Sequence, residues 1–414
     1  MTSSAVTPSM ARAAIAVCTA IYFLDGLIHT ILGPLAPDIA RSLSLGNAEL
    51  GPIFSSNLVG QCIGLVLFPA IASRFGHRLT VTLAVVGFAL GQAASALADD
   101  GTSLFAIRLV TGVFLGGCLP SCLAIVTAQA PAERRGISIL VLFTGYGLGA
   151  AMAGLVAAGF ADLGGWRAAM VAVGGLSLLA AAAAWLWLRD DQSREPETVP
   201  SEVTSGRPAA LQMLDPAYRI GTLMLWLLFV LMLTISYCLN SWLPVMLVEV
   251  GHDEAFAALS VTIFGFGGAI AALGVGLLID RFGAMPVLIG FLTAAAAALF
   301  ATGQVIATAS AATLMVLLGA AGFFSLGAYG GVNVVLAGFY PDALRATGIG
   351  WAKSVGRLGT VIAPILIGFA LSAGMSSTLV MSLFAAPAVL AGTALVVISR
   401  TGVWRAAQRQ PARI

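Results

Sequence analysis

The segment PAIASRFGHR at residues 69–78 has a second copy in the chain, GLLIDRFGAM at residues 276–285. Both copies follow a long apolar run, and both place an arginine two residues before a glycine. Ser73 in the first copy corresponds to Asp280 in the second, an offset of 207 residues, which is half of the chain. Internal symmetry of this kind indicates a protein built from two similar halves.

A second pair of segments repeats with nearly the same offset. PAERRG (131–136) and PDALRATG (341–348) are 210 residues apart, and their alignment superposes Arg135 on Arg345. The two pairs together indicate that the halves of the chain repeat each other.

The composition excludes an ordinary soluble protein. The 414 residues are 59% hydrophobic and only 9% charged, against about 25% charged residues in soluble domains. The mean hydropathy of +0.99 places most of the chain in an apolar environment. A soluble enzyme, a nucleic-acid-binding protein and a disordered chain are therefore excluded. The five cysteines lie in apolar segments without metal-ligand spacing, and we interpret them as small buried hydrophobic residues.

Polar and turn-forming residues divide the chain into twelve apolar segments, each long enough for a spanning helix of about 20 residues. The long hydrophilic stretch from Arg189 to Pro216 separates six segments from six. We therefore expect an all-α membrane protein with an N-terminal half at 1–188, a linker at 189–217 and a C-terminal half at 218–414. The expected spans are 13–40, 47–72, 78–98, 102–128, 135–160, 166–188, 218–248, 254–279, 285–306, 309–339, 344–373 and 376–400.

Loop arginines set the expected orientation. With the N-terminus inside, fifteen arginines fall on the inner side and two, Arg41 and Arg167, on the outer side. Positively charged loop residues favour the cytoplasmic side. Both termini and the linker are therefore expected in the cytoplasm.

The first repeated motif resembles the signature G-x-L-A-D-R-x-G-R-R of the major facilitator superfamily. The first copy keeps Arg74, Gly76 and Arg78 but has Ser73 in place of the acid. The resemblance implies the major facilitator fold and transport by alternating access. The second copy keeps Gly276, Asp280, Arg281 and Gly283.

Three segments also resemble the bacterial aromatic acid:proton symporters, which take up benzoate-like carboxylates with protons. The first, LDGLIHTILGPLAPDIA (24–40), is similar to their first helix, although the second acid of their D-G-x-D motif is Ile28 here. These symporters usually carry an acid near the end of span 4, and this chain has Gln129 at that position. The other similar segments are 241–251 with 266–283, and 330–364.

Span 11 contains two cations on one helix face. Lys353 is the single lysine of the chain, and Arg357 follows one helical turn later. We interpret both as binding an anionic substrate, because a charge inside a membrane indicates function. The alternative is that Arg357 is structural and that Lys353 extends towards the cytoplasm. Span 11 also resembles that of animal organic anion transporters, where an arginine is implicated in anion binding.

Asp25 is the single carboxylate well inside a span, and His29 lies one turn further on the same face. We expect Asp25 to carry the coupling proton, with His29 either sharing this role or serving as a satisfied polar residue. Arg108 in span 4 is interpreted as a partner in coupling or as an outer-leaflet cation that extends to the surface. Further substrate-binding candidates are Asn57, Gln61, Asn333, Tyr22, Tyr146 and Tyr329, and Tyr237, Phe264 and Trp351 are weaker aromatic candidates.

One acid, one histidine and three cations inside the spans favour an anionic substrate. We expect a monomeric, multi-pass transporter of the bacterial inner membrane that moves a small organic anion, most plausibly a carboxylate, with protons. No cofactor, metal or nucleic acid is expected, and the chain has no G-x-x-x-x-G-K-[ST] motif. The alternatives are an efflux antiporter and a transporter-like ligand sensor.

The motif residues are candidates for an inner gate. Because Ser73 and Gln129 replace two acids of the superfamily, we expect weaker closure of the inner side and a resting preference for the inward-open state. The gating candidates are Ser73, Arg74, Gly76, Arg78, Arg135, Asp280, Arg281 and Arg345.

Overall fold

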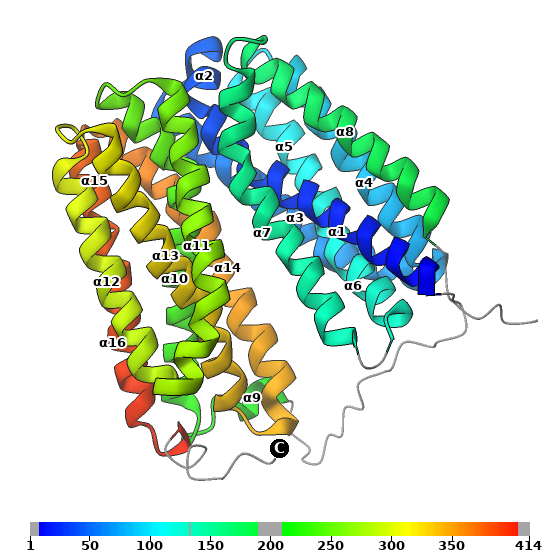
Figure 1. Cartoon of the computed structure of the whole chain (residues 1–414), viewed down its shortest axis with the longest axis vertical. Coiled ribbons are helices and arrows are strands. Elements are labelled where there is room, and N and C mark those ends of the chain that lie inside the picture. The colour runs from blue at the N-terminus through cyan, green and yellow to red at the C-terminus, as the bar shows by residue number, and fades with distance from the viewer. Residues whose placement is uncertain (1–7, 132–133, 189–208, 405–414) are drawn as a thin grey trace, which may run out of the picture. The chain divides into compact units, whose positions relative to one another are not determined.

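The computed structural model describes residues 8–131, 134–188 and 209–404. This part of the chain is helical and contains twelve helical segments long and apolar enough to cross a membrane (Figure 1). The helices are α1 (Pro8–Thr30), α2 (Leu32–Leu43), α3 (Asn47–Phe75), α4 (His77–Ala94), η1 (Ser95–Leu97), α5 (Gly101–Gly116), α6 (Cys118–Gln129), α7 (Arg135–Phe160), α8 (Gly165–Trp187), α9 (Ala209–Gln212), α10 (Arg219–Glu249), α11 (Glu254–Phe282), α12 (Ala284–Val305), α13 (Ala311–Phe339), α14 (Asp342–Ser372), α15 (Ser377–Leu383) and α16 (Ala385–Arg400).

The prediction of twelve spans is confirmed, but three of them are broken helices. The first ends as α1 and resumes as α2 after Ile31, the fourth breaks at Gly117 between α5 and α6, and the last breaks at Phe384 between α15 and α16. Residues 189–208 of the predicted linker lie outside the described residues, and the short helix α9 follows them.

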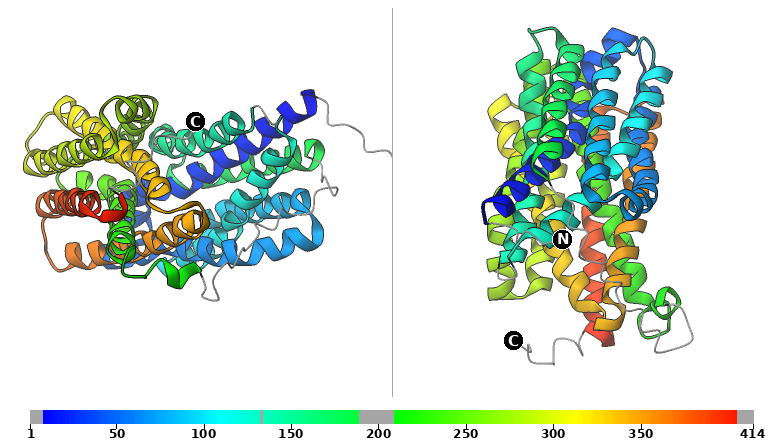
Figure 2. Two further views of the ribbon diagram at one scale, coloured as in Figure 1. Left: turned by 90° about the horizontal axis from the view of Figure 1, so that it is seen from below. Right: turned by 90° about the vertical axis from the view of Figure 1, so that its right-hand side faces the viewer.

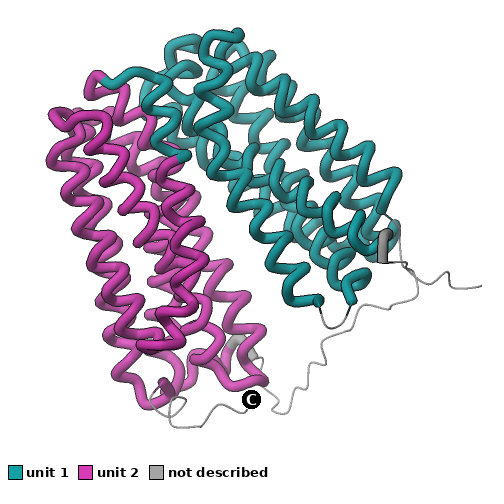
Figure 3. Tube along the Cα trace, in the orientation of Figure 1, with its two compact units in different colours: residues 1–197, 252–262 teal, residues 198–251, 263–414 magenta. Residues whose placement is uncertain are grey.

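The chain forms two compact units (Figure 3). Unit 1 consists of residues 1–197 with 252–262, and unit 2 of residues 198–251 with 263–414. Figure 2 shows from two further directions that the helices within each unit lie side by side.

The start of α11 belongs to unit 1 because it contacts α2 and α7. Arg41 forms an ion pair with Glu254, and the backbone N–H of Leu155 donates to Thr262 Oγ1 over 2.9 Å. An ion pair and a side-chain hydrogen bond therefore hold this segment to the first unit.

Glycines bring α3 and α5 of unit 1 into backbone contact. Gly60 and Gly64 on α3 face Gly112 and Gly116 on α5, so each helix carries a G-x-x-x-G pattern on the shared face. A Cβ atom added at Gly112 would lie 3.0 Å from the Cα atom of Asn57. Small residues at this spacing allow close helix packing in lipid. This close contact sets the position of Asn57 along α5.

The same kind of contact joins α1 to α7. A Cβ atom added at Gly26 would lie 2.9 Å from the carbonyl carbon of Tyr146, and one added at Gly149 would lie 2.8 Å from that of Phe23. Asp25 therefore sits beside the tightest contact between these two helices.

The two repeated motifs adopt the same turn. Gly76 ends α3 with φ 83° and ψ 160°, and Gly283 ends α11 with φ 84° and ψ 154°. A residue with a Cβ atom is strained at such positive φ angles, so both copies need glycine here. The preceding arginines also match, since the guanidinium of Arg74 lies 5.4 Å from the ring of Phe75 and that of Arg281 lies 5.2 Å from the ring of Phe282.

The expected outer loops of unit 1 are held together by Arg167. Its guanidinium donates to the carbonyls of Ala96 and Ala98 over 3.0 and 3.1 Å and to Ser42 Oγ over 2.8 Å. The guanidinium also lies 4.4 Å from the ring of Trp166. One side chain therefore joins α2, the α4–α5 connection and α8.

In unit 2, α10 packs against α14 and α16, and α12 packs against α13 and α16. The connection between α13 and α14 is fixed by Tyr340, whose hydroxyl donates to Thr222 Oγ1 over 2.9 Å, while Thr222 donates to the carbonyl of Met213 over 2.9 Å. Burial raises the pKa of Tyr340, and its hydrogen bond with Thr222 partly opposes this effect. The start of α10 is thereby tied to the end of α13.

Candidate functional site

Asp25 and His29 lie in the last turns of α1, just before the break at Ile31. The carboxyl group of Asp25 is buried, with an exposed fraction of 1%. The ring of Tyr146 on α7 lies 6.1 Å from the ring of His29 and 5.1 Å from the ring of Tyr22. The structure therefore gathers an acid, an imidazole and two phenols at the contact between α1 and α7.

Three buried cysteines lie near the same face of α1. The side chains of Cys18 and Cys122 form a hydrogen bond, and the carboxylate of Asp25 interacts electrostatically with Cys118 and Cys122. All three thiols are free and fully buried. They agree with the interpretation of these residues as small buried hydrophobic groups, and they give Asp25 a weakly polar environment.

Arg108 on α5 is fully buried, so the interpretation as a cation extending to the membrane surface is wrong. Its guanidinium donates to Gln92 Oε1 over 2.6 Å and to the carbonyl of Ile28 over 2.9 Å. Gln92 is held in turn by a 2.9 Å contact between Nε2 and Met170 Sδ. Within the described residues no carboxylate lies within 4.0 Å of Arg108. Arg108 thus joins α5 to α4 and to the end of α1.

Asn57 and Gln61 lie one turn apart on α3 and are both buried. The backbone of Asn57 faces Gly112, and the backbone of Gln61 faces Gly116, so both residues lie on the contact with α5. Across the described part of the chain, neither side-chain polar atom of Asn57 has a hydrogen-bond partner.

In unit 2, Arg357 on α14 lies near a phenol of a neighbouring helix. Tyr329 on α13 interacts electrostatically with Arg357 and also with Tyr237 on α10. Lys353, one turn earlier on α14, is exposed, whereas Arg357 is half-buried. The structure therefore places a guanidinium and an ammonium on one face of α14, with Tyr329 near the guanidinium and Tyr237 near Tyr329.

The remaining polar and aromatic candidates of unit 2 have different surroundings. Asn333 donates to the carbonyls of Tyr329 and Gly330 of its own helix, over 3.0 and 3.2 Å. Trp351 is 44% exposed and stacks on Trp226 with the ring centroids 5.8 Å apart. Phe264 is 1% exposed and packs under Gly322, so it belongs to the core and not to a cavity wall.

The gating candidates lie at the ends of helices. Ser73 donates to the carbonyl of Ala70 in its own helix over 2.9 Å. Arg345 pairs with Asp342 over 2.6 Å in the first turn of α14. Asp280 is exposed and makes no ion pair within the described residues.

Arg78 and Arg135 differ in their surroundings. The guanidinium of Arg78 donates to the carbonyl of Trp185 over 2.5 Å and stacks on its indole at 4.4 Å. Arg135 is the first residue of α7. Arg78 therefore fastens the start of α4 to the end of α8.

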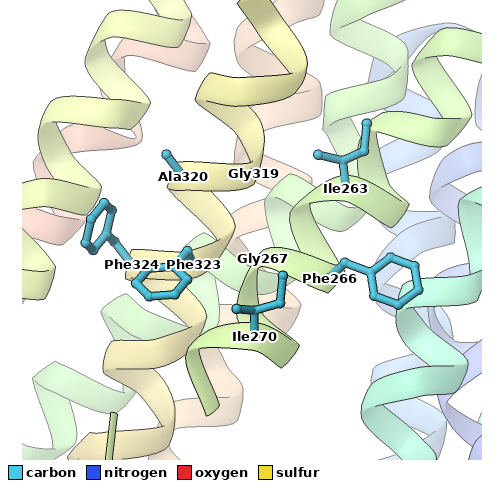
Figure 4. Close-up of a pocket in the computed structure, with 8 residues that line it drawn as sticks. All are labelled: Ile263, Phe266, Gly267, Ile270, Gly319, Ala320, Phe323 and Phe324. Atoms are coloured by element: carbon cyan, nitrogen blue, oxygen red, sulfur yellow. The ribbon is translucent and has the colours of Figure 1, made fainter. Parts of the chain in front are cut away.

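Each unit also has an open apolar groove. The groove in unit 2 has a volume of about 490 Å³ and lies between α11 and α13 (Figure 4). The groove in unit 1 has about 540 Å³ and lies between α1 and α7. Neither groove is lined by a predicted site residue. The lining residues are Ile263, Phe266, Gly267, Ile270, Gly319, Ala320, Phe323 and Phe324 in unit 2, and Ala16, Thr19, Ala20, Phe23, Val141, Thr144, Gly145 and Leu148 in unit 1.

Sequence reasoning missed two residues that contact the candidates. Gln92 gave no signal, because a single glutamine inside an apolar run does not reveal which helix it faces. Trp226 was also missed, because a tryptophan near a span end is an ordinary membrane-interface residue and gives no further signal. Both were found only from their contacts with Arg108 and Trp351.

Comparison with known proteins gives one family over nearly the whole chain. The sequence matches the Major Facilitator Superfamily at residues 18–253 and 225–413. It is 29% identical to the gallate transporter of Pseudomonas putida and 30% identical to the 4-hydroxybenzoate transporter PcaK of Pseudomonas aeruginosa, in each case over 92% of this chain and 90% of the relative. It is also 30% identical to the 3-(3-hydroxy-phenyl)propionate transporter of Escherichia coli over 93% of both chains.

Solved structures share the fold at lower identity. The inward open conformation of the xylose transporter XylE of E. coli matches with a TM-score of 0.75 and 17% identity over 92% of this chain and 95% of that chain. The nucleoside transporter NupG matches with a TM-score of 0.75 and 15% identity over 94% and 99% of the two chains. With twelve apolar spans and relatives that are transporters of aromatic acids, the chain belongs to the major facilitator superfamily and is a multi-pass membrane transporter, not an enzyme.

Proposed function

We propose that this transporter takes up a small aromatic carboxylate together with protons across the bacterial inner membrane, as a monomer. The observation that carries this proposal is the pair of cations one helical turn apart on α14 inside a span, with the phenol of Tyr329 close enough to interact electrostatically with Arg357. The names of the relatives support it, because gallate, 4-hydroxybenzoate and hydroxyphenylpropionate are all aromatic carboxylates.

Lys353 and Arg357 together bind the carboxylate in this proposal. Arg357 can hold both oxygens through its fork of N–H groups, while Lys353 contributes a compact charge. Two cations one turn apart repel each other, and an anion between them relieves this repulsion and forms charge-assisted hydrogen bonds. Tyr329, Tyr237 and Asn333 would surround the ring and the anionic group.

Asp25 carries the proton in this proposal, and His29 and Arg108 influence its transfer. The carboxyl group is buried beside the α1–α7 contact, away from solvent. His29 lies one turn away on the same helix face. Tyr22 and Tyr146 line the same region.

Transport proceeds by alternating access between two six-helix halves, residues 1–188 and 218–414, with both termini and the 189–217 linker in the cytoplasm. The repeated turns at Gly76 and Gly283 support a pseudo-symmetric arrangement. The inner side closes weakly because Ser73 bonds only within its own helix, whereas Asp280 retains its acid. The inward-open state is therefore favoured at rest.

Binding and uptake measurements test the proposal. A thermal-shift screen of carboxylates and sulfonates on purified protein should show a raised melting temperature for aromatic carboxylates, because a ligand of the folded state stabilises it by mass action. Lys353→Ala and Arg357→Ala should each weaken binding by about 30-fold or more, because each removes one of the two cations that hold the carboxylate. Arg357→Lys should recover only part of the loss.

A matched control removes a cation elsewhere. Arg400→Ala deletes one positive charge at the exposed end of α16 and should leave binding unchanged. If both α14 alanine variants bind with the affinity of the wild type, the two cations are structural and the proposed substrate site is wrong.

A further inference from the structure

Asn57 is a buried amide whose hydrogen-bonding capacity is unused. Its side chain is 3% exposed, and neither Nδ2 nor Oδ1 has a partner in the part of the chain that the structure describes. Asn57 lies about 15 Å along α3 from its first residue, Asn47, and four residues from the helix midpoint at Gln61. Buried polar side chains in proteins are nearly always paired, so Asn57 calls for a partner that the helices do not supply.

The packing around Asn57 keeps its backbone in place. Its Cα atom would be only 3.0 Å from a Cβ atom added at Gly112, so the two helices are in backbone contact here and a larger residue at position 112 would displace α3. The neighbouring Ser56 shows the usual solution for a buried polar group, since its hydroxyl donates to the carbonyl of Ile53 in its own helix over 2.8 Å. Among the described residues, the amide of Asn57 forms no such hydrogen bond to a carbonyl of its own helix.

Arg108 also lies in unit 1, and like Asn57 it has a buried polar atom without a hydrogen-bond partner among the described residues. It is one helical turn before Gly112 on α5. Its Nη atoms are occupied by Gln92 and the carbonyl of Ile28, while its Nε has no hydrogen-bond partner among the described residues. Two adjacent helices therefore carry unsatisfied polar groups inside their spans, which a purely structural core would not retain.

The amide of Asn57 selects one kind of ligand group. It offers N–H donors and one carbonyl acceptor, so a hydroxyl group, which both donates and accepts, satisfies both ends. A carboxylate can accept from Nδ2 but leaves Oδ1 facing a negative charge. An unsubstituted ring edge satisfies neither atom.

We propose that Asn57 is a specificity-determining residue that binds a hydroxyl group of the substrate. This inference rests on the proposed function, because it presupposes an aromatic carboxylate as the transported anion. The substrate is then a hydroxylated aromatic acid, and Asn57 recognises its hydroxyl group. An analogue that lacks the hydroxyl group leaves the buried amide unpaired and is rejected for that reason.

The experiment compares ring-substituted acids in proteoliposomes containing the full chain. Initial uptake and competition are measured with benzoate, 4-hydroxybenzoate, 3-hydroxybenzoate and 4-fluorobenzoate, whose fluorine fills a similar space but cannot donate. The wild type should prefer one hydroxybenzoate over benzoate and 4-fluorobenzoate by about tenfold or more, the factor expected for one unpaired buried group. This comparison needs no variant, so it holds even if a substitution at Asn57 prevents folding.

Variants then assign the preference to Asn57. Asn57→Leu should reduce the preference for hydroxybenzoate over benzoate to within about twofold, because it weakens the binding of hydroxybenzoate more than that of benzoate. Ser56→Ala, the buried neighbour whose hydroxyl bonds only within its helix, should keep the full preference. A size-exclusion profile and melting temperature of each variant identify any that do not fold.

Each outcome decides between the two proposals. If the wild type takes up benzoate, hydroxybenzoates and 4-fluorobenzoate equally well, the role of Asn57 is overturned while the proposed function stands. The same holds if Asn57→Leu keeps the preference or lowers the uptake of all four acids by the same factor, as expected for an amide that holds only a water molecule. If the wild type takes up none of them, the proposed function fails and this inference fails with it.

Discussion

The contact between α1 and α7 can be tested with two glycines of the same helix. Gly149 faces Phe23 and Leu27 on α1, and a Cβ atom there would lie 2.8 Å from the carbonyl carbon of Phe23 and 3.0 Å from the nitrogen of Leu27. Ordinary carbon–carbon contacts are about 3.5–4.0 Å. The Gly149→Ala substitution therefore forces α1 and α7 apart by about 0.7 Å or more. Overpacking of this kind costs ~1–3 kcal/mol.

Gly147→Ala is the matched control, because nothing lies within 4 Å of a Cβ atom at that position on the same helix. Because alanine has a higher helix propensity than glycine, this substitution should leave the free energy of unfolding unchanged or raise it by up to ~1 kcal/mol. The assay is the temperature at which half of each detergent-purified variant has left the monomer peak in size-exclusion chromatography. Gly149→Ala should melt several degrees below the wild type and Gly147→Ala at or above it. Equal melting temperatures for the two variants would refute the packing argument.

Three further predictions concern single residues. Asp25→Asn should abolish accumulation driven by an imposed pH gradient while substrate exchange between the two sides continues, and a variant that still accumulates substrate would place the proton elsewhere. Ser73→Asp should restore a charged group at the inner gate and shift the population towards inner closure, as measured by distances between labels on the cytoplasmic ends of the halves; a wild type already closed without substrate would contradict this. Arg167→Ala removes three hydrogen bonds from one cation and should lower stability by ~2–4 kcal/mol, measured by thermal unfolding with Arg400→Ala as the exposed-charge control, and an unchanged melting temperature would contradict it.

The spans and the repeat could be predicted because they depend on local features. Apolar runs of the required length mark the helices, and the two copies of R-F-G mark equivalent turns, which the φ angles of Gly76 and Gly283 bear out. The breaks at Ile31, Gly117 and Phe384 were not predicted, although each lies three residues before a proline, which has no backbone N–H to donate to the preceding turn. A proline alone does not mark a break in this chain, because Pro52, Pro69, Pro244 and Pro364 lie inside continuous helices.

Only the charged residues of the candidate site could be predicted from the sequence. Asp25, Arg108 and Arg357 were recognised because an ionisable residue inside an apolar run is conspicuous. Their partners were not, since a sequence does not show which helices adjoin: Gln92 beside Arg108 is an example. For Arg108 the sequence allowed two interpretations, and only its complete burial excludes the one in which it reaches the surface.

The hydrogen bonds of Arg108 also bear on how the protein is assembled during synthesis. An arginine inside a span is costly to insert into lipid, by up to about 2.5–3.5 kcal/mol at the helix centre on the insertion scale. Both partners of its Nη atoms, Ile28 and Gln92, precede it in the chain, on the first and third spans. When the fourth span leaves the ribosome, the acceptors for its guanidinium are already in the membrane. Because the first and third spans are synthesised before the fourth, the guanidinium of Arg108 can leave the insertion machinery and bond to Gln92 and the carbonyl of Ile28 without exposure to the lipid tails.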